Sequence, residues 1–200
     1  MAYKLSEEKI VENENLVKKL VASLQAPLNE KVEQMLVYGV PEYFLAPASG
    51  KIEFHGCYIG GLVDHSLRVA VNLQTLAKNL APSVYDPKSL VFLALMHDLG
   101  KVGDVGVPMY VDNPSQWHKD KLGQLFEINK QLPYMPICDR TMYLLQKFNI
   151  SLTNEEYIAI RISDGPYEKA NEKYGMKEPD LALLLHFADR WACAQEKRLA

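Results

Sequence analysis

The feature that most constrains the fold is a run of seven apolar residues, Leu90–Met96, which ends directly in the adjacent pair His97 and Asp98. Periodicity alone does not decide whether such a run forms a buried strand or a buried helix. No alternating strand pattern stands out elsewhere, which favours a helix over residues 87–99, ended by Gly100. In either case, a buried segment places an imidazole and a carboxylate at its end.

Helical spacing of apolar residues, together with capping signals and breaks at proline or glycine, divides most of the chain into helices. The expected helices cover residues 5–24, 28–38, 61–80, 87–99, 115–131, 139–148, 154–162 and 179–200, and residues 39–60 form an irregular stretch. Thr153 and Glu156 form a capping-box pair at the seventh helix. This pattern predicts an all-α fold, a compact helical bundle. The last helix has an expected inner face of Leu181, Leu184, Leu185, Ala188 and Ala192.

Composition and charge restrict the class of protein. A length of 200 residues, 48% of them hydrophobic and 24% charged, is typical of one globular domain. A net charge of −3 gives no overall basic surface, so we do not expect stable nucleic-acid binding to be the main role.

The cellular location follows from what the sequence lacks. A membrane span needs about 20 apolar residues, and the longest run here is seven. The N-terminal MAYKLSEEKIVENEN is polar and acidic and has no signal-peptide core. The three cysteines, Cys57, Cys138 and Cys193, form no CxxC pair, so we interpret them as reduced residues with packing roles. We therefore expect a cytoplasmic protein with no membrane segment.

A second acidic residue lies in an apolar helix and needs a partner. Asp189 lies within LALLLHFADRWA, and an unpaired buried carboxylate is very costly. One solution is a metal ion, for which the chain offers two imidazoles and two carboxylates: His65, His97, Asp98 and Asp189. Such a ligand set suits Mn, Fe, Co, Ni or Zn. The other solution is that both carboxylates pair with Lys101, Arg190 or backbone N–H groups. The residue types alone leave both open.

The order of these residues resembles the H…HD…D signature of the HD-domain metal-dependent phosphohydrolases. The first histidine, His65, lies in GGLVDHSLRVA, the pair His97-Asp98 in LALMHDLGKVGD, and Asp189 in LLLHFADRWA. The resemblance covers roughly residues 44–196, and FLAPAS…FHG…GGLVDHS is further similar to a branch found in bacteria and phages. It implies that the four ligands converge on one divalent ion in a helical bundle. Residues 51–200 would form the HD domain, and residues 1–50 an N-terminal helical appendage packed on it.

The sequence departs from the pattern at the place where many relatives bind a second metal ion through two further histidines. Ile137 and Ser163 stand where those histidines are expected. Apart from His186, three residues before Asp189, His118 is the only histidine between the His97-Asp98 pair and Asp189, and its polar context QWHKDKLG is typical of an exposed helix start. We therefore expect one ion per chain. Asp164 is a substitute ligand, a hydrogen-bond acceptor behind the ligands, or a turn residue of SDGP, and the sequence does not decide between these alternatives.

Substrate-binding candidates surround the predicted metal ligands. Lys101 follows Asp98 by three residues and would share its helix face, where it could bind phosphate; the alternative is an exposed lysine at a helix end. The resemblance places Lys101 and Asp98 in the catalytic machinery and places the loop of His55 near the pocket, where its imidazole could contact a phosphate. Arg68, one turn after His65, and Asp164 are further candidates for substrate contacts. His186 shares a face with Asp189 and is interpreted as packing behind the site.

The predicted function is hydrolysis of a small phosphorylated substrate, above all a nucleotide, by a 5′-nucleotidase or deoxynucleoside triphosphate hydrolase type of enzyme. Two alternatives remain open: a phosphodiesterase or 3′–5′ exonuclease-like enzyme, and a non-catalytic HD scaffold that binds a nucleotide. The cytoplasm would be bacterial, or that of the host for a phage protein. The sequence leaves a homo-oligomer open.

Overall fold

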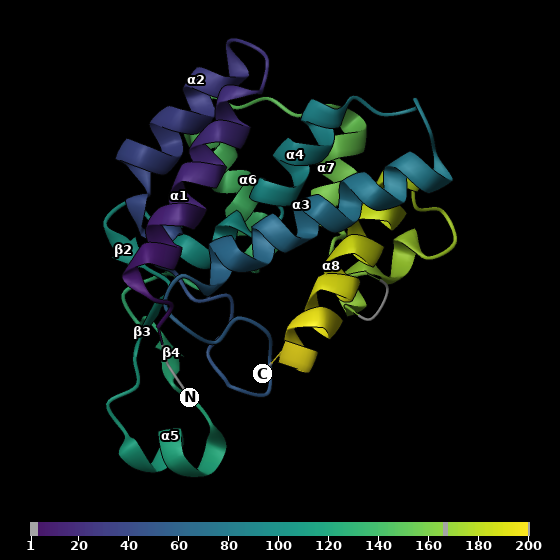
Figure 1. Ribbon diagram of the computed structural model, residues 1–200. Coiled ribbons are helices and arrows are strands. Elements are labelled where there is room, and N and C mark those ends of the chain that lie inside the picture. Colours follow the sequence, from purple (N-terminus) through teal and green to yellow (C-terminus); the bar gives the residue numbers. More distant parts are fainter. Residues whose placement is uncertain (1–3, 166–167, 200) are drawn as a thin grey trace.

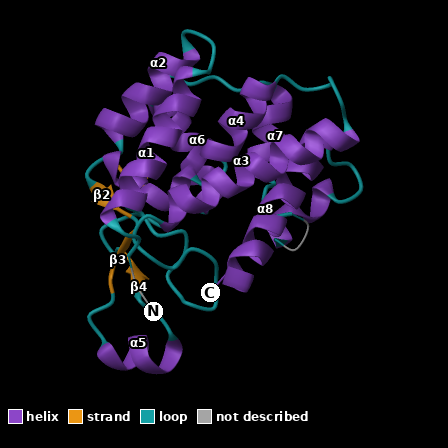
Figure 2. Cartoon of the chain, viewed as in Figure 1, coloured by secondary structure: helices purple, strands orange, loops and turns teal. Residues whose placement is uncertain are grey.

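The computed structural model describes residues 4–165 and 168–199, and within them the chain is helical with two short two-stranded sheets (Figures 1 and 2). The predicted all-α class is confirmed. The helices are α1 (Glu7–Ala22), α2 (Leu28–Glu33), α3 (Gly61–Leu80), α4 (Pro87–Met96), α5 (Gln116–Leu122), α6 (Ile137–Lys147), α7 (Asn154–Arg161) and α8 (Asp180–Leu199). Shorter helical turns cover Gln34–Gly39, Pro41–Phe44, Leu99–Val102 and Lys169–Tyr174.

The helices α3, α4 and α8 form the centre of the fold. Helix α3 packs against both α4 and α8, and α7 packs against the same two helices. All the residues predicted for the inner face of α8 are buried. The start of α3 depends on two glycines: Gly60 has a φ of 87°, and a Cβ on Gly61 would overlap the carbonyl oxygen of Gly56. This close approach holds the loop that carries His55 against the first turn of α3.

The apolar run is a buried helix, as predicted, but it ends earlier than expected. Every residue of Leu90–Met96 is buried, and His97 is the C-terminal cap of α4. Gly100 does not end the helix. It lies in the 3-10 turn Leu99–Val102, where its N–H donates to Thr141 Oγ1 at 2.8 Å and a Cβ would overlap the carbonyl oxygen of Ile137. Gly100 is therefore a point of close packing between this turn and α6.

The N-terminal helices join the same hydrophobic core as the rest of the chain. Ser6 caps α1 by accepting the N–H of Lys9 at 3.2 Å. Val17 and Met35 are fully buried within the core cluster that also contains Leu93. Tyr43, fully buried, donates its hydroxyl to the Leu95 carbonyl at 3.0 Å. The described part of the N-terminal region, residues 4–50, thus packs on the core, while the predicted boundary at residue 50 stays a prediction.

One predicted helix is wrong in its second half. The helix expected over residues 115–131 is α5 alone, because Gly123 adopts a left-handed conformation (φ 59°) that ends it. The chain then forms β4 (Phe126–Ile128), which pairs antiparallel with β3 (Tyr110–Asp112). A second hairpin joins β1 (Gly103–Asp104) to β2 (Val107–Pro108). In Figure 1, α5 projects at the bottom of the molecule, away from α3, α4 and α8.

The capping box at α7 is confirmed, since Thr153 and Glu156 each accept the other's backbone N–H, at 3.2 and 2.9 Å. No helix in the described part of the chain has the length and apolar character to cross a membrane.

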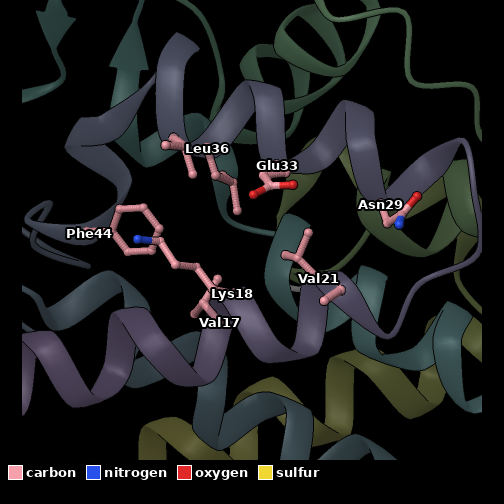
Figure 3. A pocket seen from close by; sticks show the side chains of 9 residues that line it. Val17, Lys18, Val21, Asn29, Glu33, Leu36 and Phe44 are labelled. Atoms are coloured by element: carbon pink, nitrogen blue, oxygen red, sulfur yellow. The ribbon is translucent and has the colours of Figure 1, made fainter.

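A small cavity of about 90 Å³ lies between α1 and α2, lined among others by Val17, Lys18 and Asn29 (Figure 3). It contains no predicted site residue and is small beside ligand pockets of about 300–1,000 Å³.

We expect Gly100→Ala to destabilise the protein by about 1–3 kcal/mol, because the new methyl group must displace the backbone of α6. Thermal unfolding measures the change. Gly106→Asn is the control, since nothing lies within 4 Å of a Cβ there and asparagine tolerates the positive φ of 70°. Equal melting temperatures for the Gly100→Ala variant and the wild type would contradict the packing described here.

Candidate metal centre

The structure brings the four predicted metal ligands together from three helices. His65 comes from α3, His97 and Asp98 from the end of α4, and Asp189 from α8. The Nε2 atom of His65 lies 3.0 Å from Asp189 Oδ1 and 3.7 Å from Asp98 Oδ2. The Nε2 atom of His97 lies 3.5 Å from Asp98 Oδ2 and 4.0 Å from Asp189 Oδ1.

The two imidazole nitrogens at this junction fit a metal ion. The Nε2 atoms of His65 and His97 are buried, and among the described residues neither has a partner in hydrogen-bonding geometry, although carboxylate oxygens lie close. An ion with ligand bonds of about 2.1 Å places neighbouring ligand atoms about 3.0 Å apart and opposite ones about 4.2 Å apart. The four measured separations fall within that range. Two nitrogens and two carboxylate oxygens suit a divalent transition metal.

The other nitrogen of each ring fixes its orientation. The Nδ1 atom of His97 lies 2.9 Å from the carbonyl oxygen of Ala94, and that of His65 lies 3.0 Å from Glu196 Oε1. Both partners only accept hydrogen bonds, so each ring carries its proton on Nδ1. The lone pair of each Nε2 therefore faces the centre, as a metal ligand requires.

The charges at the centre favour a cation. Burial alone would raise the pKa of Asp98, but Lys101, His97 and His65 lower it to about 2. Burial would likewise raise the pKa of Asp189, yet the adjacent His65 and the other positive charges hold it below its usual range. Without a bound ion, the carboxylates of Asp189 and Glu196 raise the pKa of His65 to about 9 despite complete burial, so an ion would displace a proton from its Nε2 atom. The negative charges of Asp98 and Asp189 thus favour the binding of a cation at the centre.

Lys101 lies on the face of Asp98, as predicted. Its Nζ is 2.6 Å from Asp98 Oδ2, and its side chain is only 12% exposed, which excludes the alternative of an exposed lysine at a helix end. Burial alone would lower the pKa of Lys101, but Asp98 holds it above its usual range, so the ammonium stays charged. The ion pair of Lys101 and Asp98 is one of the contacts expected if the two carboxylates are balanced without a metal ion. That pairing, however, gives no hydrogen-bond partner among the described residues to the Nε2 atoms of His65 and His97. Arg190, the other side chain expected to pair with these carboxylates, lies exposed on α8.

His55 lies beside the centre, where the resemblance placed its loop, and connects Lys101 to Asp189. Its Nε2 is 3.4 Å from Lys101 Nζ and its Nδ1 is 3.2 Å from Cys193 Sγ. Burial and the Lys101 charge lower the pKa of His55 to about 3, so the ring is neutral. Lys101 donates to Nε2, Nδ1–H donates to the thiol, and the thiol lies 3.6 Å from Asp189 Oδ1. Cys193 is reduced, as expected, but it also contacts a predicted ligand.

Arg68 faces carboxylates on α3 and α8. Its Nε is 3.4 Å from Glu196 Oε1, and its Nη2 is 3.2 Å from Asp64 Oδ2. The sequence interpretation missed Glu196, which is 8% exposed. A signal existed, because Glu196 follows Asp189 by two helical turns and Cys193 by three residues on one face of α8.

The remaining candidates divide between the rim of the site and other regions. Asp164 is exposed. Partial desolvation and, second, the negative charge of Asp98 raise its pKa, so Asp164 interacts electrostatically with the centre. His118 lies on the projecting α5 beside Trp117, away from the centre (Figure 1). His186 is buried behind the site, where its Nδ1 donates to the Ser163 carbonyl at 2.9 Å. Tyr110, another residue that the sequence analysis missed, is subject to the charges of Lys101 and Asp98.

The fold and the site define a helical protein with a cluster of histidine and aspartate side chains that could hold a divalent metal. The sequence model of the HD domain matches residues 62–192, and the chain belongs to that family. The match begins at the first turn of α3 and ends within α8, so it spans all four predicted ligands. HD domains bind divalent metals and are in general metal-dependent phosphohydrolases. No curated protein and no solved structure matches the chain.

We expect His97→Ala and Asp98→Ala to abolish tight metal binding, because each removes a ligand, while the helical fold is largely retained. Metal analysis of the purified variants and far-ultraviolet circular dichroism measure the two properties. A variant that retains stoichiometric metal and full hydrolytic activity would show that the ligand assignment is wrong.

Proposed function

We propose that the protein is a metal-dependent phosphohydrolase of the cytoplasm that acts on a small phosphorylated molecule, above all a nucleotide. The observation that carries this proposal is a buried ammonium group, Lys101, held 2.6 Å from a carboxylate of the predicted metal cluster. A fixed positive charge beside a divalent ion suits a phosphate group, whose negative charge grows in the transition state. The chain has a net charge of −3, which fits a substrate that needs only a local positive pocket.

Each residue around the proposed ion has its own role in hydrolysis. When bound, the ion supplies Lewis-acid polarisation of a phosphoryl oxygen and a more acidic water as nucleophile. His65, His97, Asp98 and Asp189 would hold it. Lys101 binds the phosphoryl oxygens and neutralises the charge that develops on them. His55 accepts a hydrogen bond from Lys101 and keeps the ammonium pointed at the centre. Asp164 at the rim is proposed to contact the substrate.

The test is a screen of nucleoside mono-, di- and triphosphates, cyclic dinucleotides and short oligonucleotides with Mn²⁺, Co²⁺, Ni²⁺ and Zn²⁺. We expect release of phosphate or pyrophosphate from a nucleotide, and none from the Asp98→Ala variant. Cleavage of cyclic dinucleotides or oligonucleotides alone would establish the phosphodiesterase alternative. Nucleotide binding without turnover in the metal-loaded protein would establish the scaffold alternative.

We expect one tightly bound transition metal per chain. The reason is that Ile137 and Ser163 offer no imidazole, and the Ser163 hydroxyl donates to the Ile160 carbonyl at 3.1 Å. Elemental analysis after gel filtration measures the ratio, and gel filtration also reports the oligomeric state. Two equivalents, with one of them lost in a His118→Ala variant, would overturn this prediction.

We expect Lys101→Ala to lower kcat more than it raises KM while the metal stays bound, because the ammonium acts mainly on charge that develops in the transition state. Steady-state kinetics on the first substrate from the screen measure both constants. Lys121→Ala, at the exposed end of α5, is the matched control and should change either constant by well under about tenfold. An unchanged kcat in Lys101→Ala would exclude the catalytic role.

A further inference from the structure

Glu196 is a buried carboxylate that touches a predicted metal ligand from the side opposite the metal. Its Oε1 lies 3.0 Å from Nδ1 of His65, and the two side chains are 7% and 0% exposed. We propose that Glu196 is a positioning residue that fixes the ring of His65 for metal binding, with Arg68 holding Glu196 in place. This inference rests on the metal centre of the proposed function.

The contact determines both the tautomer and the donor strength of His65. A carboxylate at Nδ1 keeps the proton on that nitrogen, so Nε2 presents its lone pair to the centre. The negative charge behind the ring also makes the imidazole a stronger ligand for a cation. His97 has only a backbone carbonyl at its Nδ1, at 2.9 Å. Of the two rings, His65 therefore depends on a side chain that can be changed without altering the backbone.

The burial of Glu196 is costly and is offset in a specific way. Its Oε2 is buried and has no hydrogen-bond partner among the described residues. Arg68 Nε, at 3.4 Å from Oε1, supplies the compensating charge. Arg68 is held in turn by Asp64 at 3.2 Å, and Asp64 accepts the hydroxyl of Tyr58 at 2.8 Å. This arrangement keeps a negative charge behind His65.

A purely structural role is the competing explanation, because the pair Arg68–Glu196 also joins α3 to α8. The two explanations differ in what they predict for the metal. A structural ion pair affects the melting temperature and leaves the ligand field of a bound ion unchanged. A positioning residue changes the affinity for the ion and the spectrum of a Co²⁺ ion at the centre.

The experiment compares Glu196→Ala and Glu196→Gln with the wild type and with Glu12→Gln, a control at an exposed glutamate of α1. The affinities for Zn²⁺ and Co²⁺ are measured by chelator competition, together with the visible spectrum of the Co²⁺ protein. We expect Glu196→Ala to weaken binding by about 10- to 100-fold and to shift the Co²⁺ bands. Glu196→Gln should have a smaller effect in the same direction, because its amide oxygen still accepts the proton on Nδ1. Glu12→Gln should match the wild type.

The outcomes separate this inference from the metal centre itself. Wild-type affinity and an unchanged Co²⁺ spectrum in both Glu196 variants would overturn the positioning role alone. If Glu196→Ala does not fold, the near-isosteric Glu196→Gln decides in the same way. If the wild type binds neither ion, both the metal centre and the role of Glu196 are wrong.

Discussion

The structure depends on the placement of two ionised carboxylates, Asp98 and Asp189, where the helices α3, α4 and α8 meet. These helices bury much of the apolar surface of the protein, and α4 is buried along the whole of Leu90–Met96. Charges in such a place must be balanced, since an isolated buried carboxylate is very unfavourable. The neighbouring groups meet this demand: two imidazoles, one ammonium and a site that fits a divalent ion.

Balancing charge in a core requires exact placement, and the local backbone provides it. The end of α4 is followed at once by a 3-10 turn, so the i and i+3 positions of Asp98 and Lys101 lie on one side. Close packing of Gly100 against the backbone of α6 fixes the position of that turn. Gly61 likewise allows the His55 loop to lie against α3, at the carbonyl of Gly56. The glycines near the site thus allow backbone segments to approach closely.

The sequence predicted the four ligands because polar residues stand out in apolar helices and because their order resembles the HD signature; the apolar pattern alone left the metal interpretation open. It predicted the bounds of α3 because Val69, Leu73, Leu76 and Leu80 recur at helical spacing. It did not predict Glu196 or Tyr110, because their roles arise from contacts between elements that lie far apart in the chain. The helix expected over 115–131 was wrong beyond Gly123, where backbone conformation and pairing with β3 outweighed local helical spacing. Strand pairing of this kind leaves no signal in the helical spacing of apolar residues.

The shared oxygen of Asp98 shows how binding of a metal and of phosphate can be linked in this centre. Asp98 Oδ2 lies 2.6 Å from Lys101 Nζ and 3.5 Å from His97 Nε2, so one oxygen faces both the ammonium and the ligand cluster. A carboxylate oxygen has two lone pairs and can serve both groups at once. Lys101 is therefore held 2.6 Å from an oxygen of a predicted metal ligand. A phosphoryl oxygen bound to the ion would meet the ammonium beside it, since the aspartate positions both.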